Sequence, residues 1–423
     1  MLNKKSITDL PVSDIQGKRI LIRVDFNVPM KDGVIQDDTR IQAALPTLQY
    51  ILKQKPKTMV LMSHLGDPKK DMQKAKEKAE GAGKSFDEEQ YLSYKHRLAP
   101  IAKHLSELLG LPVKLAPAAI GEATDNMVKQ LADGDILMLE NTRFHKEETS
   151  KDASEREKMA KELASFGDLF VNDAFGTAHR AHASTETVAH YLPAVAGLLM
   201  EKEIAYLDKV MEDPDRPFIA IIGGAKVSSK IAVLENLLQK VDRLIVGGGM
   251  AYTFLKAKGL AIGTSLVEDD MIDKAREILQ IAYEQHIYIY LPIDHLVTQE
   301  FSPDAETRHV ARGNIDEGWM GMDIGELTVQ KFQGALKGAK TVFWNGPLGV
   351  FEFERFSKGT MAIAKAVAML PDCTTIIGGG DSVSAVNKSG VADKMTHIST
   401  GGGASLELLE GKNLPGIDAL LNK

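Results

Sequence analysis

The sequence predicts an α/β protein whose core is built from parallel sheets, and two observations support this prediction. The first is a series of short segments rich in Val, Ile and Leu, in which apolar residues run continuously instead of alternating with polar ones. Continuous apolar segments are typical of strands buried on both faces. The second is that helical segments, such as 97–109 and 153–166, separate many of these strands. Alternating strands and helices favour parallel pairing with right-handed crossovers.

The expected strands are too numerous for one sheet, and a chain of 423 residues is too long for one ordinary domain. We therefore expect two sheets in two domains. The strands are expected at 19–26, 58–63, 135–140, 169–173, 218–222, 243–246, 287–291, 341–344, 374–377 and 397–400.

A domain boundary is expected near residues 195–215. Met200, Ile204, Leu207 and Met211 are spaced so that they form one apolar stripe along a helix. A segment with two prolines follows and ends that helix. We interpret the helix as a rigid connector between two domains; a helix packed inside one domain is the alternative.

Composition excludes several classes of protein. The formal net charge is −7, which argues against nucleic acid as a main partner but allows a local basic site. No apolar segment approaches the ~20 residues that span a bilayer, and the N-terminal residues have no apolar signal core. The single cysteine, Cys373, lies in an apolar segment and is interpreted as a buried structural thiol in a reducing compartment. We expect a cytoplasmic monomer that binds small molecules and neither nucleic acid nor membrane.

The two halves of the chain differ in the residues that come directly after their strands. In the second half, glycine runs follow four strands, at 223–224, 247–249, 378–380 and 401–403. In the first half, comparable strands are followed by Arg, His, Asp and Asn. Parallel-sheet proteins bind ligands at the carboxyl ends of their strands. Backbone N–H groups with lysines suit nucleotide phosphates, and an Arg/His cluster suits a small anion, so the pattern indicates phosphoryl transfer across a cleft.

In the first half, the candidate ligand-binding side chains each have a plain structural alternative. Asp25 and Asn27 could bind hydroxyl groups of a ligand, or could simply end a strand in a turn. His64 lies at a second strand end, where a histidine is more often structural. Arg143 follows a third strand, and Arg180 follows a fourth, flanked by His179 and His182. Several Arg and His residues at the ends of one sheet favour an anion site over isolated surface ion pairs.

In the second half, Lys226 and Lys230 follow a strand and are expected to lie on one face near a helix N-terminus, where both could contact an anion. Solvated lysines are the alternative. Glu352 could accept hydrogen bonds from ribose hydroxyls. Asp381 could be a helix N-cap, or could also bind Mg²⁺.

Two familiar nucleotide motifs are absent. The segment 83–85 resembles the end of a P-loop, but it lies in a charged stretch and the first glycine that the motif requires would fall at Lys78. The glycine runs at 247–249 and 401–403 lack the third glycine of the dinucleotide fingerprint, which disfavours a dehydrogenase. The charged stretch itself, residues 67–95, is expected to be a solvated helical or mobile insertion.

Taken together, motifs along the whole chain resemble the phosphoglycerate kinase family. They are RVDFNVP at 23–29, SHLG at 63–66, ENTRFH at 140–145, NDAFGTAHRAH at 172–182, GGAKVSSK at 223–230, GGGMAYTF at 247–254, GWMGMDIG at 318–325, WNGPLGVFE at 344–352, GGGDS at 378–382 and STGGGASLELLEG at 399–411.

The resemblance implies two doubly wound, Rossmann-like domains joined by a helix, with a cleft between them. It implies an acid-binding domain at 1–196, a connecting helix at 197–213, a nucleotide domain at 214–405, and a tail at 406–423 that returns to the first domain.

The resemblance also implies roles for individual residues. Those expected to bind 3-phosphoglycerate or 1,3-bisphosphoglycerate are Asp25, Phe26, Asn27, Arg40, His64, Leu65, Gly66, Arg143 and Arg180, supported by His179 and His182. Those expected to bind the nucleotide are Lys226, Lys230, Gly248, Gly249, Gly321, Asn345, Pro347, Glu352, Gly379, Gly380, Asp381 and Ser382. Those expected to take part in the transfer are Arg40, Lys226, Lys230, Gly380 and Gly403, with Asp381 as the Mg²⁺ contact.

The implied reaction is reversible: MgADP and 1,3-bisphosphoglycerate give MgATP and 3-phosphoglycerate. One position departs from the family pattern, because Asp67 stands where an arginine usually follows SHLG. We expect the enzyme to stay active, since the other basic residues are present. Two alternatives remain: another small-molecule kinase that shares the nucleotide half, and a catalytically weak homologue kept as a binding protein.

Overall fold

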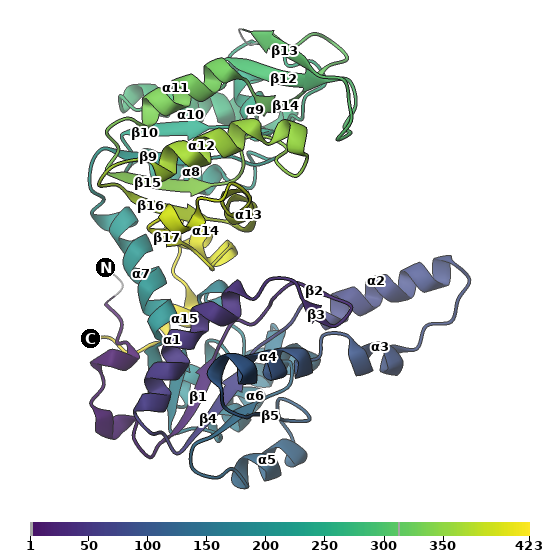
Figure 1. Cartoon of the computed structure of the whole chain (residues 1–423), viewed down its shortest axis with the longest axis vertical. Helices are drawn as coiled ribbons and strands as arrows, with labels where there is room; N and C mark the ends of the chain where they lie inside the picture. The colour runs from purple at the N-terminus through teal and green to yellow at the C-terminus, as the bar shows by residue number, and fades with distance from the viewer. Residues whose placement is uncertain (1–2, 312–313) are drawn as a thin grey trace. The chain divides into compact units, whose positions relative to one another are not determined.

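The computed structural model describes residues 3–311 and 314–423, and the chain divides into two compact units (Figure 1). The first unit contains the residues up to Ile204 together with Asn413–Lys423, and the second contains Ala205–Lys412. Within the described residues, no helix combines the length and the apolarity that a bilayer crossing requires.

The first unit is built on a six-stranded parallel sheet in the order β5-β6-β4-β1-β7-β8. Its strands are β1 (Arg19–Arg23), β4 (Thr58–Met62), β5 (Val113–Leu115), β6 (Asp135–Met138), β7 (Leu169–Asn172) and β8 (Ala194–Ala196). The helices of the same unit include α1 (Thr39–Lys53), α4 (Ala99–Leu109), α5 (Glu122–Lys129) and α6 (Ala153–Ala164). Because β1 lies between β4 and β7, the chain winds outward from β1 in both directions. This is the doubly wound arrangement that was expected.

The second unit repeats the plan with the strand order β11-β10-β9-β15-β16-β17. Its strands are β9 (Phe218–Ile222), β10 (Arg243–Val246), β11 (Tyr288–Tyr290), β15 (Thr341–Asn345), β16 (Thr374–Gly378) and β17 (His397–Ile398). Its helices are α8 (Ile231–Leu238), α9 (Met250–Ala257), α10 (Ile272–Glu284), α11 (Glu326–Leu336), α12 (Lys358–Ala368), α13 (Gly380–Lys388) and α14 (Gly403–Leu409). A three-stranded antiparallel sheet is added by β12 (Asp294–Thr298), β13 (Arg308–Ala311) and β14 (Met320–Ile324).

The prediction of two parallel sheets is therefore confirmed, and the main omissions are short or polar strands. The strands β5 and β8 have three residues each, too few for an apolar pattern to stand out. The strand β12 begins with a buried aspartate and a buried histidine, Asp294 and His295, which hide its strand character. A two-stranded hairpin of β2 (Met30–Lys31) and β3 (Val34–Ile35) was also not expected.

The charged insertion forms two helices, α2 (Pro68–Gly81) and α3 (Glu88–Tyr94), visible as a hairpin in Figure 1. Asp67 caps α2, because its carboxylate accepts a hydrogen bond from the backbone N–H of Lys70. Asp87 caps α3 in the same way through the N–H of Gln90. Of the α2 residues, only Pro68 is buried. The helical interpretation of this insertion is confirmed, and it arises from capping and charge pairing more than from a hydrophobic face.

The predicted connector is the helix α7 (Leu198–Glu212), and the division between the two units falls within it. Its apolar stripe of Met200, Ile204, Leu207 and Met211 is buried. The final helix, α15 (Pro415–Asp418), and the residues around it belong to the first unit.

Asp173, directly after β7, fixes the start of α7. Its Oδ1 atom accepts hydrogen bonds from the backbone N–H groups of Leu199 (3.0 Å) and Met200 (3.2 Å). Burial raises the pKa of Asp173 to about 6, although these N–H donors and the Thr47 hydroxyl act in the opposite direction. Gly197 leaves room for the carboxylate, since a Cβ atom there would lie 2.1 Å from Oδ1 of Asp173.

Replacing Gly197 with alanine should therefore destabilise the first unit. Overpacking of this kind typically costs ~1–3 kcal/mol. Gly81→Ala is the matched control, because a Cβ atom at Gly81 meets nothing within 4 Å. Amide hydrogen exchange in β7 and β8 measures the stability of the unit. Equal protection in the two variants would contradict this account of Gly197.

Candidate active site

Polar side chains of the first unit gather at the carboxyl ends of β1, β4, β6 and β7. Asp25 is buried after β1, and its Oδ2 atom accepts a hydrogen bond from Nη1 of Arg40 at 2.8 Å. Arg40 lies in the first turn of α1 with its side chain 34% exposed, so the guanidinium remains open to a ligand. The two residues form a paired donor and acceptor set at one edge of the sheet.

The loop after β4 is held by side chains from neighbouring strand ends. The N–H of Gly66 donates to Oδ1 of Asn27 at 2.8 Å. The side chain of Asn141 accepts from the N–H of Leu65 and donates to the Leu65 carbonyl. Nη1 of Arg143 donates to the Gly66 carbonyl at 2.7 Å. The loop and Arg143 are therefore positioned together, before any ligand binds.

A buried arginine orients His64. Nη2 of Arg23 lies 3.2 Å from Nδ1 of His64, and both side chains are buried. Because a guanidinium can only donate, Nδ1 accepts and the proton of the neutral ring resides on Nε2. Burial lowers the pKa of His64 well below its usual value, and the neighbouring arginines lower it further. His64 is thus a neutral hydrogen-bond donor rather than a cation.

Arg23 itself is held by a chain of hydrogen bonds. Its Nε atom donates to Oγ of Ser184 at 2.9 Å, and that hydroxyl donates to Oε1 of Glu148 at 2.6 Å. Glu148 is fully buried and also accepts from the hydroxyl of Thr142. The charge of the arginine is therefore balanced by hydrogen bonds that reach a buried carboxylate.

Beside this group is a cavity of about 710 Å³ whose lining includes Arg143, Arg180 and His182. Burial lowers the pKa of His182 to about 3, and the two arginines contribute to that shift. His182 is therefore neutral at physiological pH, and the positive charge of this cavity comes from arginine and lysine.

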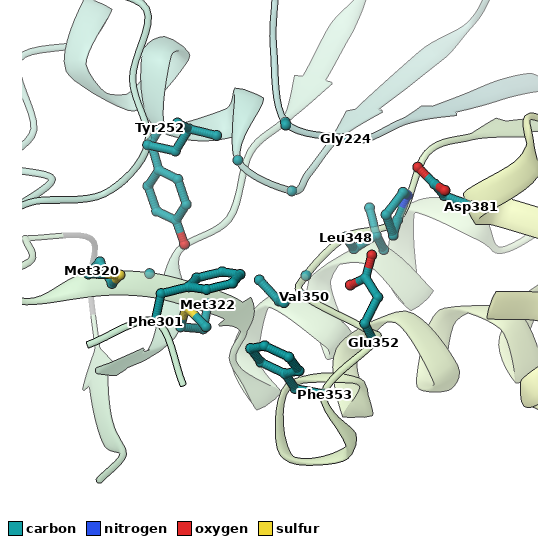
Figure 2. Close-up of a pocket in the computed structure, with 17 residues that line it drawn as sticks. Gly224, Tyr252, Phe301, Met320, Met322, Leu348, Val350, Glu352, Phe353 and Asp381 are labelled. Atoms are coloured by element: carbon teal, nitrogen blue, oxygen red, sulfur yellow. The ribbon is translucent and has the colours of Figure 1, made fainter. Parts of the chain in front are cut away.

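The second unit has a cavity of about 540 Å³ with one apolar end and one acidic end (Figure 2). Figure 2 shows Tyr252, Phe301, Val350 and Phe353 with Met320 and Met322 around the apolar end, and Glu352 and Asp381 at the other. Phe301 and Phe353 pack against each other with ring centroids 5.2 Å apart. A flat heterocycle with attached hydroxyl groups would match this division of apolar and acidic surface.

An adjoining cavity of about 450 Å³ is lined by the glycine runs, Lys226, Lys230, Asn345 and Asp381. It also includes Gly379, Gly380 and Gly403, together with Gly402 from the run at 401–403, to which no individual role was assigned. The Lys230 ammonium donates a hydrogen bond to Oδ1 of Asn345. Since Asn345 is neutral, it orients the ammonium group without cancelling its charge.

The structure corrects the prediction that one helix carries both lysines. The helix α8 begins at Ile231, and Lys230 is its N-cap residue. Lys226 lies in an exposed turn before the helix. In the segment before the helix, Val227 is buried and Ser228 donates hydrogen bonds to Glu268, so these residues are held by contacts outside α8. The two lysines still line the same cavity, but not because of helical spacing.

Close contacts explain why glycine occupies several positions that line the cavities of the second unit. Gly248 has φ +68°, and a Cβ atom there would lie 2.7 Å from backbone atoms of Gly224 and Pro347. Gly321 leaves room for Tyr252, because a Cβ atom would lie 1.8 Å from its hydroxyl oxygen. The buried hydroxyl of Ser382 accepts a hydrogen bond from the N–H of Gly346, so it fixes the turn after β15. The loops are therefore packed backbone against backbone.

Asp381 is not the N-cap of α13, which corrects one of the two predicted roles. The N-cap residue is Gly379, and Asp381 lies one residue inside the helix. Its carboxylate is exposed and lines both cavities of the second unit. Among the described residues, no group of three or more acidic, histidine or cysteine side chains could hold a metal ion. One carboxylate fits Mg²⁺ that is held mainly by nucleotide phosphates and water.

Two expected contacts have buried side chains. Phe26 and Leu65 belong to the core, so only their backbone groups are near the site. Conversely, three residues to which the sequence analysis assigned no role orient the site residues of the first unit: Arg23, Asn141 and Ser184. Arg23 and Asn141 lie within the motifs at 23–29 and 140–145, and membership of these motifs could have indicated a role for them.

Two doubly wound sheets, each with a ligand-binding edge rich in anion-binding groups, define the class of nucleotide-dependent phosphotransferases. Comparison with known proteins gives the particular family. The family described as Phosphoglycerate kinase matches residues 7–412. The chain therefore belongs to the phosphoglycerate kinase family, whose members are transferases of glycolysis.

Individual relatives agree with this assignment. The chain is 52% identical over 409 residues to the phosphoglycerate kinases of two strains of Treponema pallidum, one of them strain Nichols, covering 96% of this chain and 97% of each relative. The solved phosphoglycerate kinase of Coxiella burnetii is 40% identical, with a TM-score of 0.82 and 98% of both chains covered. That of Pyrococcus horikoshii OT3 is 34% identical, with a TM-score of 0.81 and the same coverage.

The close packing at Gly248 generates a prediction. Gly248→Ala should weaken ADP binding and lower the stability of the second unit, because the contacting backbone atoms cannot move cheaply. Gly259→Ala is the control: Gly259 has φ +81°, but a Cβ atom there meets nothing within 4 Å. Both tryptophans, Trp319 and Trp344, lie in this unit, so their fluorescence follows its unfolding. Equal losses in both variants would mean that only the φ angle matters.

Proposed function

We propose that the chain transfers a phosphoryl group reversibly between 1,3-bisphosphoglycerate and MgADP, giving 3-phosphoglycerate and MgATP. The observation that carries the proposal is the family match over residues 7–412, which includes both walls described above. The first unit would bind the three-carbon acid, and the second would bind the nucleotide. A coupled assay with 3-phosphoglycerate and MgATP tests this, and absence of turnover would instead favour a binding protein.

In this proposal, the acid site consists of Asp25, Asn27, Arg40 and His64, with Arg143 and Arg180. Asp25 and Asn27 accept from and donate to the substrate hydroxyl, and neutral His64 donates from Nε2. The arginine guanidinium groups match the planar geometry of carboxylate and the oxygens of phosphate. His179 and His182 support that basic patch.

The nucleotide would lie across the two cavities of the second unit. Its base would occupy the apolar end beside Gly249 and Gly321, and Glu352 would accept from the ribose hydroxyls. Its phosphates would meet Lys226, Lys230 and the N–H groups around Gly379 and Gly380. Mg²⁺, held by Asp381 and the phosphates, would neutralise charge on the phosphate oxygens.

We propose direct in-line transfer, because the sequence motifs contain no candidate residue for a covalent intermediate. The transferring group keeps negative charge on its equatorial oxygens, so positioning and positive charge supply the catalysis. Arg40 from the first unit, with Lys226, Lys230, Gly380 and Gly403 from the second, would surround it. The two units must then close so that the reacting atoms lie within ~3–3.5 Å and water is excluded. We propose that the enzyme is cytoplasmic and monomeric. Sedimentation analysis tests the oligomeric state.

Arg40→Ala should lower kcat strongly, with a smaller effect on the KM for 3-phosphoglycerate. Loss of a group that stabilises charge in the transition state typically costs ~10²–10³-fold in rate. Lys53→Ala, at the other end of α1, is the control and should retain normal turnover. Unchanged kcat in Arg40→Ala would overturn its catalytic role.

Lys230→Met should lower kcat by orders of magnitude while the thermal midpoint changes little. The substitution keeps an apolar stem and removes the charge, and a helix N-terminus alone carries only about half a unit charge. Lys365→Met is the control, since Lys365 is exposed on α12 of the same unit. Activity lost only through unfolding, seen as a large fall in the midpoint, would identify Lys230 as a structural residue.

A further inference from the structure

We propose that Lys69 and Lys70, in the first turn of α2, are additional substrate-binding residues that contact the phosphate group of the three-carbon acid beside Arg143 and Arg180. This inference rests on the proposed function, because it extends the acid site of the first unit. It gives the charged insertion a role in binding that neither the sequence motifs nor the comparisons assign.

The first argument is location. The lining of the cavity of about 710 Å³ includes Lys69 and Lys70 from α2 together with Arg143 and Arg180. The arginines follow β6 and β7, so residues far apart in sequence meet around one space. A ligand held by the two arginines in this cavity would also face the lysines.

The second argument is charge. Among the described residues, five cationic side chains line the cavity, namely those of Lys69, Lys70, Arg143, Lys146 and Arg180, and Asp67 is the only carboxylate. The excess is notable in a chain with a net charge of −7. Concentrated positive charge in a concave site attracts small anions.

The third argument is that these two lysines are available. Within the described residues, neither Lys69 nor Lys70 has a side-chain hydrogen bond or ion pair, whereas Lys76 on the same helix pairs with Glu88 at 2.9 Å. Burial also leaves Nε of Arg143 without a hydrogen-bond partner among the described residues. Lysines that line a cavity without a partner are suited to a dianionic ligand.

The fourth argument is that α2 is fixed in place. Its N-cap, Asp67, accepts from the N–H of Lys70 at 3.2 Å, and Nε2 of His96 lies 3.5 Å from Oδ2 of Asp71. His96 also packs against Gly66, where a Cβ atom would lie 2.5 Å from its Nδ1 atom. Gly66 is the residue whose carbonyl binds Arg143. The start of α2 is thus attached to the loop that positions the arginine.

These contacts also account for Asp67. The carboxylate at this position caps a helix, so it supplies no positive charge to the cavity. The lysines that follow it supply that charge from the first turn of the helix it caps. The insertion therefore exchanges one basic side chain in a loop for two on a capped helix.

The main test compares two double variants of α2 that remove the same charge. Lys69→Met with Lys70→Met should raise the KM for 3-phosphoglycerate about tenfold, as expected for lost charge-assisted hydrogen bonds, and leave the KM for ATP within about twofold. Lys74→Met with Lys78→Met is the matched control, because both lysines are exposed on α2 outside the cavity lining. Equal KM values for 3-phosphoglycerate in the two double variants would overturn the proposal.

A second variant tests the same site by a gain. Asp67→Asn keeps an efficient N-cap, because asparagine caps helices as well as aspartate does, and removes the only carboxylate of the lining. The KM for 3-phosphoglycerate should fall about threefold, by the loss of one nearby repulsion. A KM that is unchanged or higher would count against an anion beside α2.

Direct binding separates this inference from the proposed function. Isothermal titration of the full chain with inorganic phosphate and with 3-phosphoglycerate needs no turnover. If the wild-type chain shows no turnover, the proposed function is wrong. In that case, weaker binding of both anions only in the Lys69/Lys70 variant would still support the anion site. An active wild-type chain whose two double variants bind both anions equally would overturn the inference alone.

Discussion

Both units depend on one constraint: a parallel strand buried on both faces must leave the sheet at a fixed edge, where its last backbone groups have no strand to pair with. Every connection from one parallel strand to the next has to cross back, so all carboxyl ends meet at the same edge. At that edge, N–H groups and short polar side chains are available to a ligand without disturbing the core. Many site residues of each unit result from this geometry, because they lie in the loops that follow a strand, whereas Arg40 lies in α1 and Gly321 within β14.

The two units use the edge differently. The first presents side chains, and a buried layer of Arg23, Ser184 and Glu148 sets the orientation of the visible groups. The second presents backbone, and glycines allow its loops to pack within van der Waals range of each other, as Gly223 does against Pro347. Arginine guanidinium groups match the geometry of carboxylate and phosphate, and successive backbone N–H groups suit phosphate oxygens. The division of labour matches a reaction with one small acid and one nucleotide.

The features of the fold and site that could be predicted are those marked by a pattern in neighbouring residues of the sequence. Strands such as β9 and β10 were predicted with correct bounds, because continuous apolar residues and a following glycine mark them in the sequence itself. The late start of α8 was not predicted, and the residues before it make a contact that no local pattern reveals, because Ser228 binds Glu268, forty residues away. The roles of Arg23 and Asn141 likewise depend on partners from other strands. Family resemblance predicted which residues face a ligand, but it gave no role to the buried residues that hydrogen-bond to them.

The closing segment of the chain has a consequence for how the protein is made. The side chain of Asn172 donates to the Gly416 carbonyl, and Leu421 bonds through its backbone to both Lys5 and Ala194. The edge of the first sheet at β8 is therefore completed by residues of the segment Asn413–Lys423, which follows the whole second unit in the sequence. Domains usually fold in order as they emerge. Because Ala205–Lys412 is synthesised before Asn413–Lys423, the second unit can finish folding while the first still lacks this segment, so the first unit is completed after the second.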